Sequence, residues 1–350
     1  MSEVGLRTAD FDYDLPTKLI ASRPADVRDH SRLLVLGPGG ALLDRKFPDL
    51  AEYVTPGDAL VLNQTRVFPA RLVGRKPTGA PAEILLVRPR FDLDASGTVF
   101  ESLVRPGGKL KPGRSVDIAP GFRVVVEDSV PGGGRLVRLE GKDDPWALIE
   151  RHGHVPLPPY IEREDDESDR ERYQTVFAVH RGSVAAPTAG LHFTQPLLDR
   201  LEASGVHLVR ITLHVGIGTF RPVSAARPED HELHAEWYRV GPAAARTLNE
   251  VRDNGGRICA VGTTSVRTLE TAVRSDGRFQ AVEGWTDLFI HPPYDFRAVD
   301  VLVTNFHLPR SSLLMLVSAF AGRESVLAAY GHAVEQDYRF YSYGDAMVIP

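Results

Sequence analysis

Residues 183–222 read SVAAPTAGLHFTQPLLDRLEASGVHLVRITLHVGIGTFRP, and they predict one helix followed by one strand. Thr194 is a favoured N-cap residue, and Pro196 lies in the first turn, where a missing N–H does no harm. The helix ends before Gly205, and branched, alternating residues then predict a strand over 206–213. Two turns rich in glycine and threonine lie one on either side of this helix and strand, and each turn contains one histidine. Such open backbone lets a ligand approach N–H groups, although tight turns alone also require glycine.

Predicted helices and strands alternate through the rest of the C-terminal region. Alternation of this kind is typical of the α/β class, in which helices cover both faces of a mostly parallel sheet. We predict helices over 242–251, 265–274, 311–320 and 324–335, and strands over 33–36, 59–62, 173–177, 257–261, 285–290 and 301–303.

Residues 69–145 have a different pattern. Short β-like segments are separated by glycine and proline turns such as Gly107-Gly108, and no helical periodicity occurs. Several short strands with regular turns predict a small barrel. The chain is therefore expected to have a discontinuous α/β catalytic domain, residues 1–68 and 146–350, interrupted by an inserted β-barrel domain, residues 69–145.

The composition indicates a globular protein. Of 350 residues, 43% are hydrophobic and 25% are charged, which suits about two domains. The single cysteine, Cys259, lies in an apolar segment, so we expect a buried thiol and a reducing compartment. We find no signal peptide and no apolar run that could span a bilayer. A cytoplasmic monomer without membrane contact is expected.

The net charge of −5 does not exclude nucleic acid as a partner. Residues 162–172 (EREDDESDRER) hold seven acids and three bases, so they contribute −4 and the remaining chain only −1. Two stretches without acids occur near Arg71 and near Lys109. Such clusters can attract phosphates, although scattered bases at hairpin tips are a commoner explanation.

Polar residues follow three of the predicted strands. They are the segments 214–219 (HVGIGT), 262–267 (GTTSVR) and 304–307 (TNFH). In sheets of this class ligands bind beyond the carboxyl ends of the strands. Thr263 and Thr264 also stand at a helix N-terminus, where free N–H groups suit oxygen ligands. These segments together predict a ligand site.

Other motifs are absent or weak. Gly216 and Gly218 lack the third glycine of the dinucleotide fingerprint, and no GxxxxGK[ST] loop exists. His231, His234 and Glu236 form the best metal-ligand set, but the histidines are three apart and not four as in HExxH, so hydrogen bonding is favoured over metal binding. A metal-dependent hydrolase that uses this set remains one alternative. A noncatalytic RNA-binding module is the other, and it leaves the polar strand ends unexplained.

Long segments resemble one known family. These are SVAAPTAGLHFT, LHVGIGTFRPV, HELHAEWY, AVGTTSVRTLE, GWTDLFI, TNFHLP, LLMLVSAFAG and FYSYGDAMVI, preceded by DFDYDLP, RDHSRLLVL and TRVFPARL. In this order they resemble the S-adenosylmethionine:tRNA ribosyltransferase-isomerases of queuosine biosynthesis, over about residues 10–349. The resemblance implies an α/β domain interrupted by a β-barrel, which agrees with the pattern described above.

The resemblance also implies a reaction. The ribosyl part of S-adenosylmethionine moves to the aminomethyl group of a 7-deazaguanine base at the tRNA wobble position and rearranges, giving epoxyqueuosine, adenine and methionine. S-adenosylmethionine would be a co-substrate, with no permanent cofactor. Because the sulfonium acidifies the neighbouring carbon, no metal is needed. The anticodon arm of tRNA would bind with the wobble base splayed into the cleft between the domains.

The resemblance suggests roles for residues at the strand ends. His214 and His307, which we expect to end adjacent strands, would hold or move protons, and a structural histidine at either position is an equal alternative. Glu270 or Asp345 would contact the ribose hydroxyls or the amine. Arg267 would meet the methionine carboxylate, unless it pairs with Glu270 in its own helix. The remaining residues expected around S-adenosylmethionine are Thr188, Gly190, Gly218, Thr263 and Thr264.

Five basic residues are the candidates for contacts with tRNA phosphates. The phosphate candidates are Arg66, Arg71, Arg75, Lys109 and Lys111.

The sequence departs from the family pattern at Gln64, where an acid is expected, and at His291-Pro292-Pro293, where Tyr-Pro-Gly is expected. A role for a carboxylate at the first position is therefore in doubt.

Overall fold

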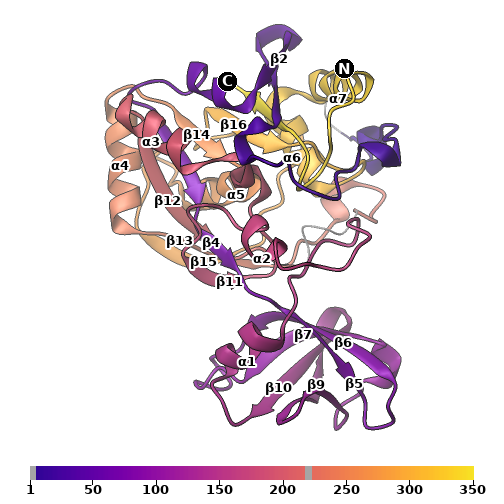
Figure 1. Ribbon diagram of the computed structural model, residues 1–350. Coiled ribbons are helices and arrows are strands. Elements are labelled where there is room, and N and C mark those ends of the chain that lie inside the picture. Colours follow the sequence, from indigo (N-terminus) through magenta and orange to yellow (C-terminus); the bar gives the residue numbers. More distant parts are fainter. Residues whose placement is uncertain (1–4, 217–222) are drawn as a thin grey trace.

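The computed structural model describes residues 5–216 and 223–350, which form two bodies joined by a narrow connection (Figure 1). The larger body is an α/β domain built on a nine-stranded sheet, and the smaller contains a closed six-stranded barrel. The barrel strands follow β3 and β4 along the chain and precede the later strands of the large sheet. The predicted insertion of a small barrel is confirmed, while the boundaries at 69 and 145 stay predictions.

Four parallel strands, β12, β3, β14 and β16, form the centre of the large sheet. In β3, Ala59 and Val61 pack into the core on one face, and Leu60 and Leu62 pack on the other. Such burial on both faces is typical of parallel strands covered by helices. Cys259 of β14 is fully buried and free, as predicted. The strands are β1 (Arg32–Leu36), β2 (Leu42–Lys46), β3 (Ala59–Asn63), β12 (His207–Leu213), β13 (Glu236–Val240), β14 (Ile258–Val261), β15 (Val282–Thr286), β16 (Val301–Asn305) and β17 (Ala346–Ile349).

Both edges of this sheet contain antiparallel pairs. At one edge, β13 pairs antiparallel with β12, and β15 pairs antiparallel with β13. At the other edge, β17 pairs antiparallel with β16, and β2 pairs antiparallel with β1. Strands β1 and β17 pair in parallel. The prediction of a mostly parallel sheet is therefore confirmed only in part, because four of the eight strand pairs are antiparallel. A short turn over 37–41 joins β1 to β2, and so short a connection permits only antiparallel pairing.

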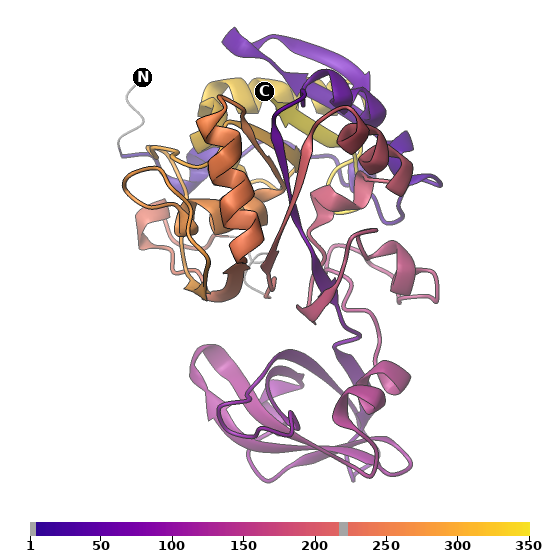
Figure 2. The same ribbon diagram turned by 90° about the vertical axis from the view of Figure 1, so that its left-hand side faces the viewer.

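Helices cover both faces of the sheet (Figures 1 and 2). Helices α4 to α7 pack on one face, and α3 packs on the other together with the 3₁₀ segment Phe47–Glu52. Helix α3 starts as predicted, because Thr194 Oγ1 accepts a hydrogen bond from the N–H of Leu197 at 3.4 Å. The helices are α1 (Pro145–His152), α2 (Asp169–Arg172), α3 (Gln195–Ala203), α4 (Pro242–Asp253), α5 (Thr263–Ala272), α6 (Ser312–Ala321) and α7 (Arg323–Glu335).

Two of the predicted strands differ from the structure. Residues 173–177 form turns, because Tyr173 is fully buried and packs edge-on against Tyr343 in place of pairing along a sheet. The strand predicted over 285–290 is displaced, since β15 already ends at Thr286.

The barrel has the strand order β10-β7-β6-β5-β8-β9. Strands β5 and β8 approach closely at Gly74, where a Cβ atom would lie 2.4 Å from the carbonyl oxygen of Asp117. Glycine therefore permits the closure at this point. Helix α1 covers one end, and its Leu148 and Ile149 belong to the barrel core. The strands are β5 (Arg71–Arg75), β6 (Pro81–Pro89), β7 (Val99–Arg105), β8 (Ser115–Ala119), β9 (Phe122–Val130) and β10 (Gly134–Gly141).

A two-stranded ribbon lies between the two bodies (Figure 1). It consists of β4 (Thr65–Val67) and β11 (His180–Ser183), which pair in parallel. Within the described residues, no single helix has the length and apolar composition to cross a membrane. Helices α6 and α7 meet these criteria only when taken together, and the chain bends by 115° between them.

Candidate active site

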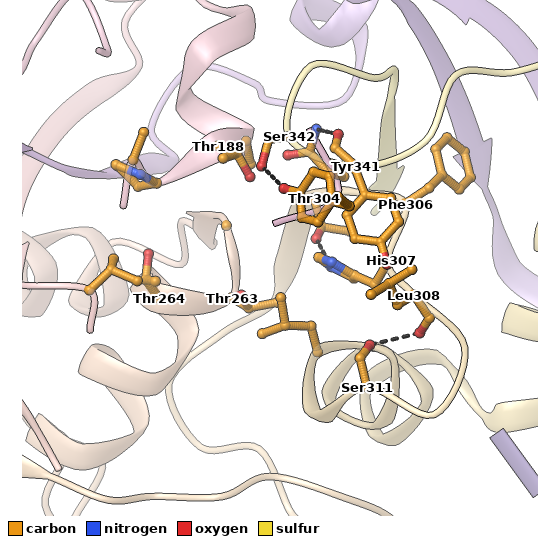
Figure 3. A pocket seen from close by; sticks show the side chains of 18 residues that line it. Thr188, Thr263, Thr264, Thr304, Phe306, His307, Leu308, Ser311, Tyr341 and Ser342 are labelled. Atoms are coloured by element: carbon orange, nitrogen blue, oxygen red, sulfur yellow. Dashed lines mark hydrogen bonds between the residues drawn. The ribbon is translucent and has the colours of Figure 1, made fainter. Parts of the chain in front are cut away.

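A cavity lies beyond the carboxyl ends of the central strands, where the sequence predicted a ligand site (Figure 3). The cavity itself has a volume of about 60 Å³, and it lies in a hollow of about 750 Å³ that includes open solvent. Residues after β14 and β16, a 3₁₀ turn before α3 and the loop before β17 surround it. The lining residues are Tyr160, Ala186, Pro187, Thr188, Ala189, Val215, Gly262, Thr263, Thr264, Thr304, Asn305, Phe306, His307, Leu308, Ser311, Leu313, Tyr341 and Ser342.

Helix α5 begins at the wall of this cavity. Gly262 makes the turn from β14 into the helix with a φ of 84°, which glycine adopts without steric cost. The N–H groups of Thr263 and Thr264 have no acceptor among the described residues. Free N–H groups at a helix start suit the oxygens of carboxylates or hydroxyls.

His307 lies in the cavity directly after β16. Its Nε2 is 2.8 Å from Oγ1 of Thr304, whereas its Nδ1 has no partner within the described part of the chain. The backbone is fixed independently, since the N–H of His307 donates to the Tyr330 hydroxyl and its carbonyl accepts from Tyr13. Burial lowers the pKa of His307 to about 3. The imidazole is therefore neutral at pH 7, with one ring nitrogen available to a ligand.

Two buried polar atoms of the lining have no hydrogen-bond partner among the residues described. They are Oδ1 of Asn305 and the hydroxyl of Tyr341. A buried atom of this kind costs about 1–3 kcal/mol. Tyr341 also has a φ of 74°, which is rare for a residue with a side chain, and its ring lies on that of Tyr160 with centroids 4.0 Å apart. Unpaired polar atoms and backbone strain at one cavity are features of a binding site.

The described lining carries no ionic side chain, since none of its residues is Asp, Glu, Lys or Arg. A cation bound there would meet hydroxyls, backbone groups, aromatic faces, the amide of Asn305 and the neutral imidazole of His307, but no opposite charge. No carboxylate of the described lining is positioned to remove a proton from a ligand.

Glu270 and Asp345, predicted as catalytic, lie outside this lining. Glu270 accepts a hydrogen bond from the N–H of Ala298 at 2.9 Å, and burial raises the pKa of Glu270. Asp345 accepts from the N–H of Arg32 at 2.9 Å and from that of Arg339 at 2.8 Å. Both carboxylates hold backbone segments together, and the geometry gives neither one access to the cavity.

Arg267 is buried and pairs with Glu236 of β13, not with Glu270 of its own helix. Its Nε donates to the carbonyl of Leu288 at 2.9 Å, and Glu236 accepts from the N–H of Gly216 at 2.7 Å. The guanidinium that we expected to meet the methionine carboxylate is thus engaged within the fold.

The alternative metal site is not assembled. Glu236 is engaged by Arg267, and the ring of His231 packs edge-on against Phe289 with centroids 5.3 Å apart. Among residues 5–216 and 223–350, no group of three or more His, Cys, Asp or Glu side chains is placed to hold a metal ion. The geometry therefore does not favour a hydrolase that uses His231, His234 and Glu236.

His214 and His307 do not come together. Strands β3 and β14 separate β12 from β16, so the prediction that these histidines end adjacent strands is wrong. The Nδ1 of His214 is 2.8 Å from Oγ1 of Thr65, and burial, with a contribution from His180, lowers the pKa of His214 to about 4. His214 lines a second cavity, between the α/β domain and the barrel.

The other residues expected around S-adenosylmethionine have different placements. Thr188, Thr263 and Thr264 line the first cavity, and Gly190 does not. A Cβ atom at Gly190 would lie 2.8 Å from the ring of Phe177, so packing explains that glycine. Gly218 lies outside the described residues.

The predicted tRNA contacts lie on different elements. Arg71 is half-buried and pairs with Glu83 at 3.1 Å. The others are exposed at separate places: on the ribbon between the domains, on β5, and on the turn between β7 and β8. In chain order they are Arg66, Arg75, Lys109 and Lys111.

Sequence reasoning missed Tyr160 and Tyr341, and it included Asn305 only as a member of the segment 304–307. Asn305 is the last residue of β16, so its position at a strand end was an available signal. Tyr160 and Tyr341 lie in connecting segments that no spacing links to the strand ends, and tertiary folding alone brings them together.

His192 gives a test of burial next to this cavity. Its Nδ1 is 2.8 Å from Oγ of Ser31, and its Nε2 is 3.1 Å from Nδ2 of Asn305. Burial, with smaller contributions from Arg339 and Arg28, lowers the pKa of His192 from 6.5 to about 3. The unfolded chain therefore takes up a proton near pH 6.5 that the folded protein refuses until about pH 3. His192 contributes stability above pH 6.5, and this contribution is lost as the pH falls.

Between pH 6 and pH 4 the free energy of unfolding falls as the pH falls. We expect His192→Gln to make this slope smaller by the contribution of one proton, roughly 1.4 kcal/mol per pH unit. Urea denaturation at a series of pH values measures this slope. The matched control is His207→Gln, because His207 is exposed. A His192→Gln slope equal to that of the unsubstituted protein would contradict the burial.

Comparisons with known proteins identify the family of this chain. A family model described as "Queuosine biosynthesis protein" matches residues 8–349. Proteins named S-adenosylmethionine:tRNA ribosyltransferase-isomerase from Symbiobacterium thermophilum, Syntrophomonas wolfei and Moorella thermoacetica are 54%, 53% and 52% identical to this chain. Each comparison covers 98% of this chain, and it covers 100%, 97% and 100% of the respective relative.

A solved structure is also similar. The crystal structure of S-adenosylmethionine tRNA ribosyltransferase from Thermotoga maritima is 39% identical, with a TM-score of 0.55 over 97% of this chain and 100% of that one. From the family match and the full-length relatives, we conclude that the chain belongs to the queuosine biosynthesis protein family.

Proposed function

We propose that the chain is an S-adenosylmethionine:tRNA ribosyltransferase-isomerase and that the first cavity binds S-adenosylmethionine. The observation that carries this function is the 52–54% identity, over nearly the full length, to relatives named for it. The proposed acceptor is the aminomethyl group of a 7-deazaguanine base at the tRNA wobble position. The products are epoxyqueuosine in tRNA, adenine and methionine.

The cavity suits this co-substrate in three ways. The free N–H groups of Thr263 and Thr264 can bind the methionine carboxylate or ribose hydroxyls. The faces of Tyr160 and Tyr341 suit the flat adenine ring, and aromatic faces also attract a cation such as the sulfonium. The uncharged lining leaves the sulfonium charge uncompensated, which favours its acidifying effect on the neighbouring carbon.

His307 is proposed to position the ribose. Its Nε2 is held by Thr304, so its Nδ1 can bind a hydroxyl of the sugar. With a pKa of about 3, a neutral His307 is a weak base at pH 7. The described lining offers no carboxylate for this step either. We therefore assign removal of the proton beside the sulfonium to the neutral amine of the acceptor base. This proton is then passed to the departing adenine, so that the amine is neutral again when it attacks the ribosyl carbon, and methionine leaves last.

The function is tested by incubating the protein with S-adenosylmethionine and tRNA that carries 7-aminomethyl-7-deazaguanine, in the presence of a chelator. Adenine and methionine should be released in equal amounts, and only when both substrates are present. Activity that appears only after zinc is added would instead support the hydrolase alternative. Binding of tRNA with no release of adenine would support the RNA-binding module.

Lys109 and Lys111 are exposed near a barrel turn and remain candidates for phosphate contacts. We expect the double variant Lys109→Ala, Lys111→Ala to weaken binding of all tRNA sequences. The slope of log Kd against log salt concentration should also decrease, by the amount that about two phosphate contacts contribute. Filter binding at several salt concentrations measures both effects. Lys18→Ala, which removes an exposed lysine of the α/β domain, is the control. Unchanged binding by the double variant would exclude this contact.

A further inference from the structure

All three tryptophans of the chain line the second cavity, which lies between the α/β domain and the barrel. Trp146 comes from α1, Trp237 from β13 and Trp285 from β15. Trp285 is 52% exposed and the neighbouring Phe91 is 55% exposed. Large aromatic side chains gathered at one cleft and left open to water indicate an interaction surface. We call this cavity the tryptophan cleft.

One wall of the tryptophan cleft is a row of flat groups. Trp237 and Trp285 stand directly opposite each other on neighbouring strands, so they lie on the same side of the sheet. The ring of His214 stacks on Trp237, with centroids 5.0 Å apart and planes inclined by 22°. From the barrel, the guanidinium of Arg88 lies over Trp285 at 4.8 Å. The row thus extends from the α/β domain to the barrel.

Two arginines of the cleft lie over tryptophan rings. Arg88 is fixed by two hydrogen bonds to Glu101, at 2.6 and 2.7 Å. The guanidinium of Arg181 lies 4.2 Å from the ring centroid of Trp146. Arg181 is also in register with the exposed Arg66 of β4, which places a second cation beside it. Aromatic faces together with guanidinium planes are the groups on which proteins stack unpaired nucleobases.

The two cavities are neighbours, because Val215 lines both of them. A nucleotide chain that places one base at the first cavity therefore brings the adjoining bases to the tryptophan cleft. Bases in a duplex are stacked on one another and present no free face. Bases of a hairpin loop can be unstacked and do present one.

We propose that the tryptophan cleft binds the unpaired bases next to the modified base in the tRNA anticodon loop, by stacking on Trp237 and Trp285. This inference rests on the proposed function, since it assigns a subsite of the same substrate. The cleft selects for single-stranded RNA, and it aligns the loop so that the reacting base enters the first cavity.

The position of the tryptophans provides the test, because the intrinsic tryptophan fluorescence of the full chain arises only at this cleft. The probe is an anticodon stem-loop RNA, and the comparison is a fully paired duplex of the same stem. We expect saturable quenching by the stem-loop and none by the duplex at equal concentration. Trp285→Ala should raise the stem-loop Kd about five-fold or more, and Trp285→Phe should keep it close to the original value.

Two further measurements separate this inference from the proposed function. Val73→Ala removes an exposed apolar side chain of the barrel outside the cleft, and it should leave the Kd unchanged. An unchanged Kd and RNA KM for Trp285→Ala, or equal quenching by the duplex, would overturn the cleft assignment even if adenine is released normally. Stem-loop binding that needs Trp285, without release of adenine, would support the cleft while the proposed function fails.

Discussion

Replacing Glu236 with alanine will lower the free energy of unfolding by about 3–5 kcal/mol. The side chains of Arg267 and Glu236 are only 6% and 5% exposed, and they pair with each other. Without Glu236, the buried guanidinium retains carbonyl partners such as Leu288 but no opposite charge. Leaving a buried charge uncompensated costs far more than the pair itself contributes. Guanidinium chloride denaturation at pH 7 measures the loss.

The matched control is the surface pair between Arg239 and Glu283, which are 52% and 62% exposed and 3.6 Å apart. Glu283→Ala should change stability by about 1 kcal/mol at most, because water screens exposed charges. A similarly small loss for Glu236→Ala would contradict the buried pair. Such a result would mean that Arg267 is free to bind the methionine carboxylate, as the sequence predicted.

Replacing His307 with alanine will slow the release of adenine by about 100-fold or more, a typical effect of removing one positioned polar group. The imidazole supplies the only histidine nitrogen among the described lining residues. The fold should persist, because Tyr13 and Tyr330 hold the backbone of His307 and not its side chain. Single-turnover kinetics with saturating S-adenosylmethionine isolate this effect from binding.

His332→Ala is the control for this substitution, because His332 is not part of the cavity lining and its Nε2 lies 3.1 Å from Asp44. It should release adenine at the original rate. A His307→Ala rate within two-fold of that value would show that the reaction does not use the first cavity as assigned. Thermal unfolding of both variants confirms that any loss of rate is not loss of fold.

Much of the fold follows from local signals in the sequence. The N-cap at Thr194 and the glycine stop after α3 are visible as residue types, and glycine turns mark the barrel. The antiparallel edges of the large sheet are not visible in this way. They depend on which strands meet in space, and similar strand patterns suit either direction of pairing.

The candidate site was predictable in part, because residue types at the strand ends are also local signals. Polar residues after β14 and β16 are found by reading strand ends, and Thr263, Thr264 and His307 line the cavity accordingly. Carboxylates cannot be assigned by this reasoning, because Glu270 is equally polar in sequence whether it faces a ligand or two backbone N–H groups. The tryptophans stand on segments far apart in the chain, and only the folded structure shows that they share one cleft.

The most direct test of the central claim uses S-adenosylmethionine labelled with carbon-13 throughout its ribose. After reaction with tRNA that carries 7-aminomethyl-7-deazaguanine, the modified nucleoside is isolated and its mass is measured. Transfer of the ribosyl group predicts that every labelled carbon appears in that nucleoside, with adenine and methionine released in equal amount. Labelled carbon that remains in a small molecule while adenine is released would mean hydrolysis of S-adenosylmethionine, and it would contradict the account.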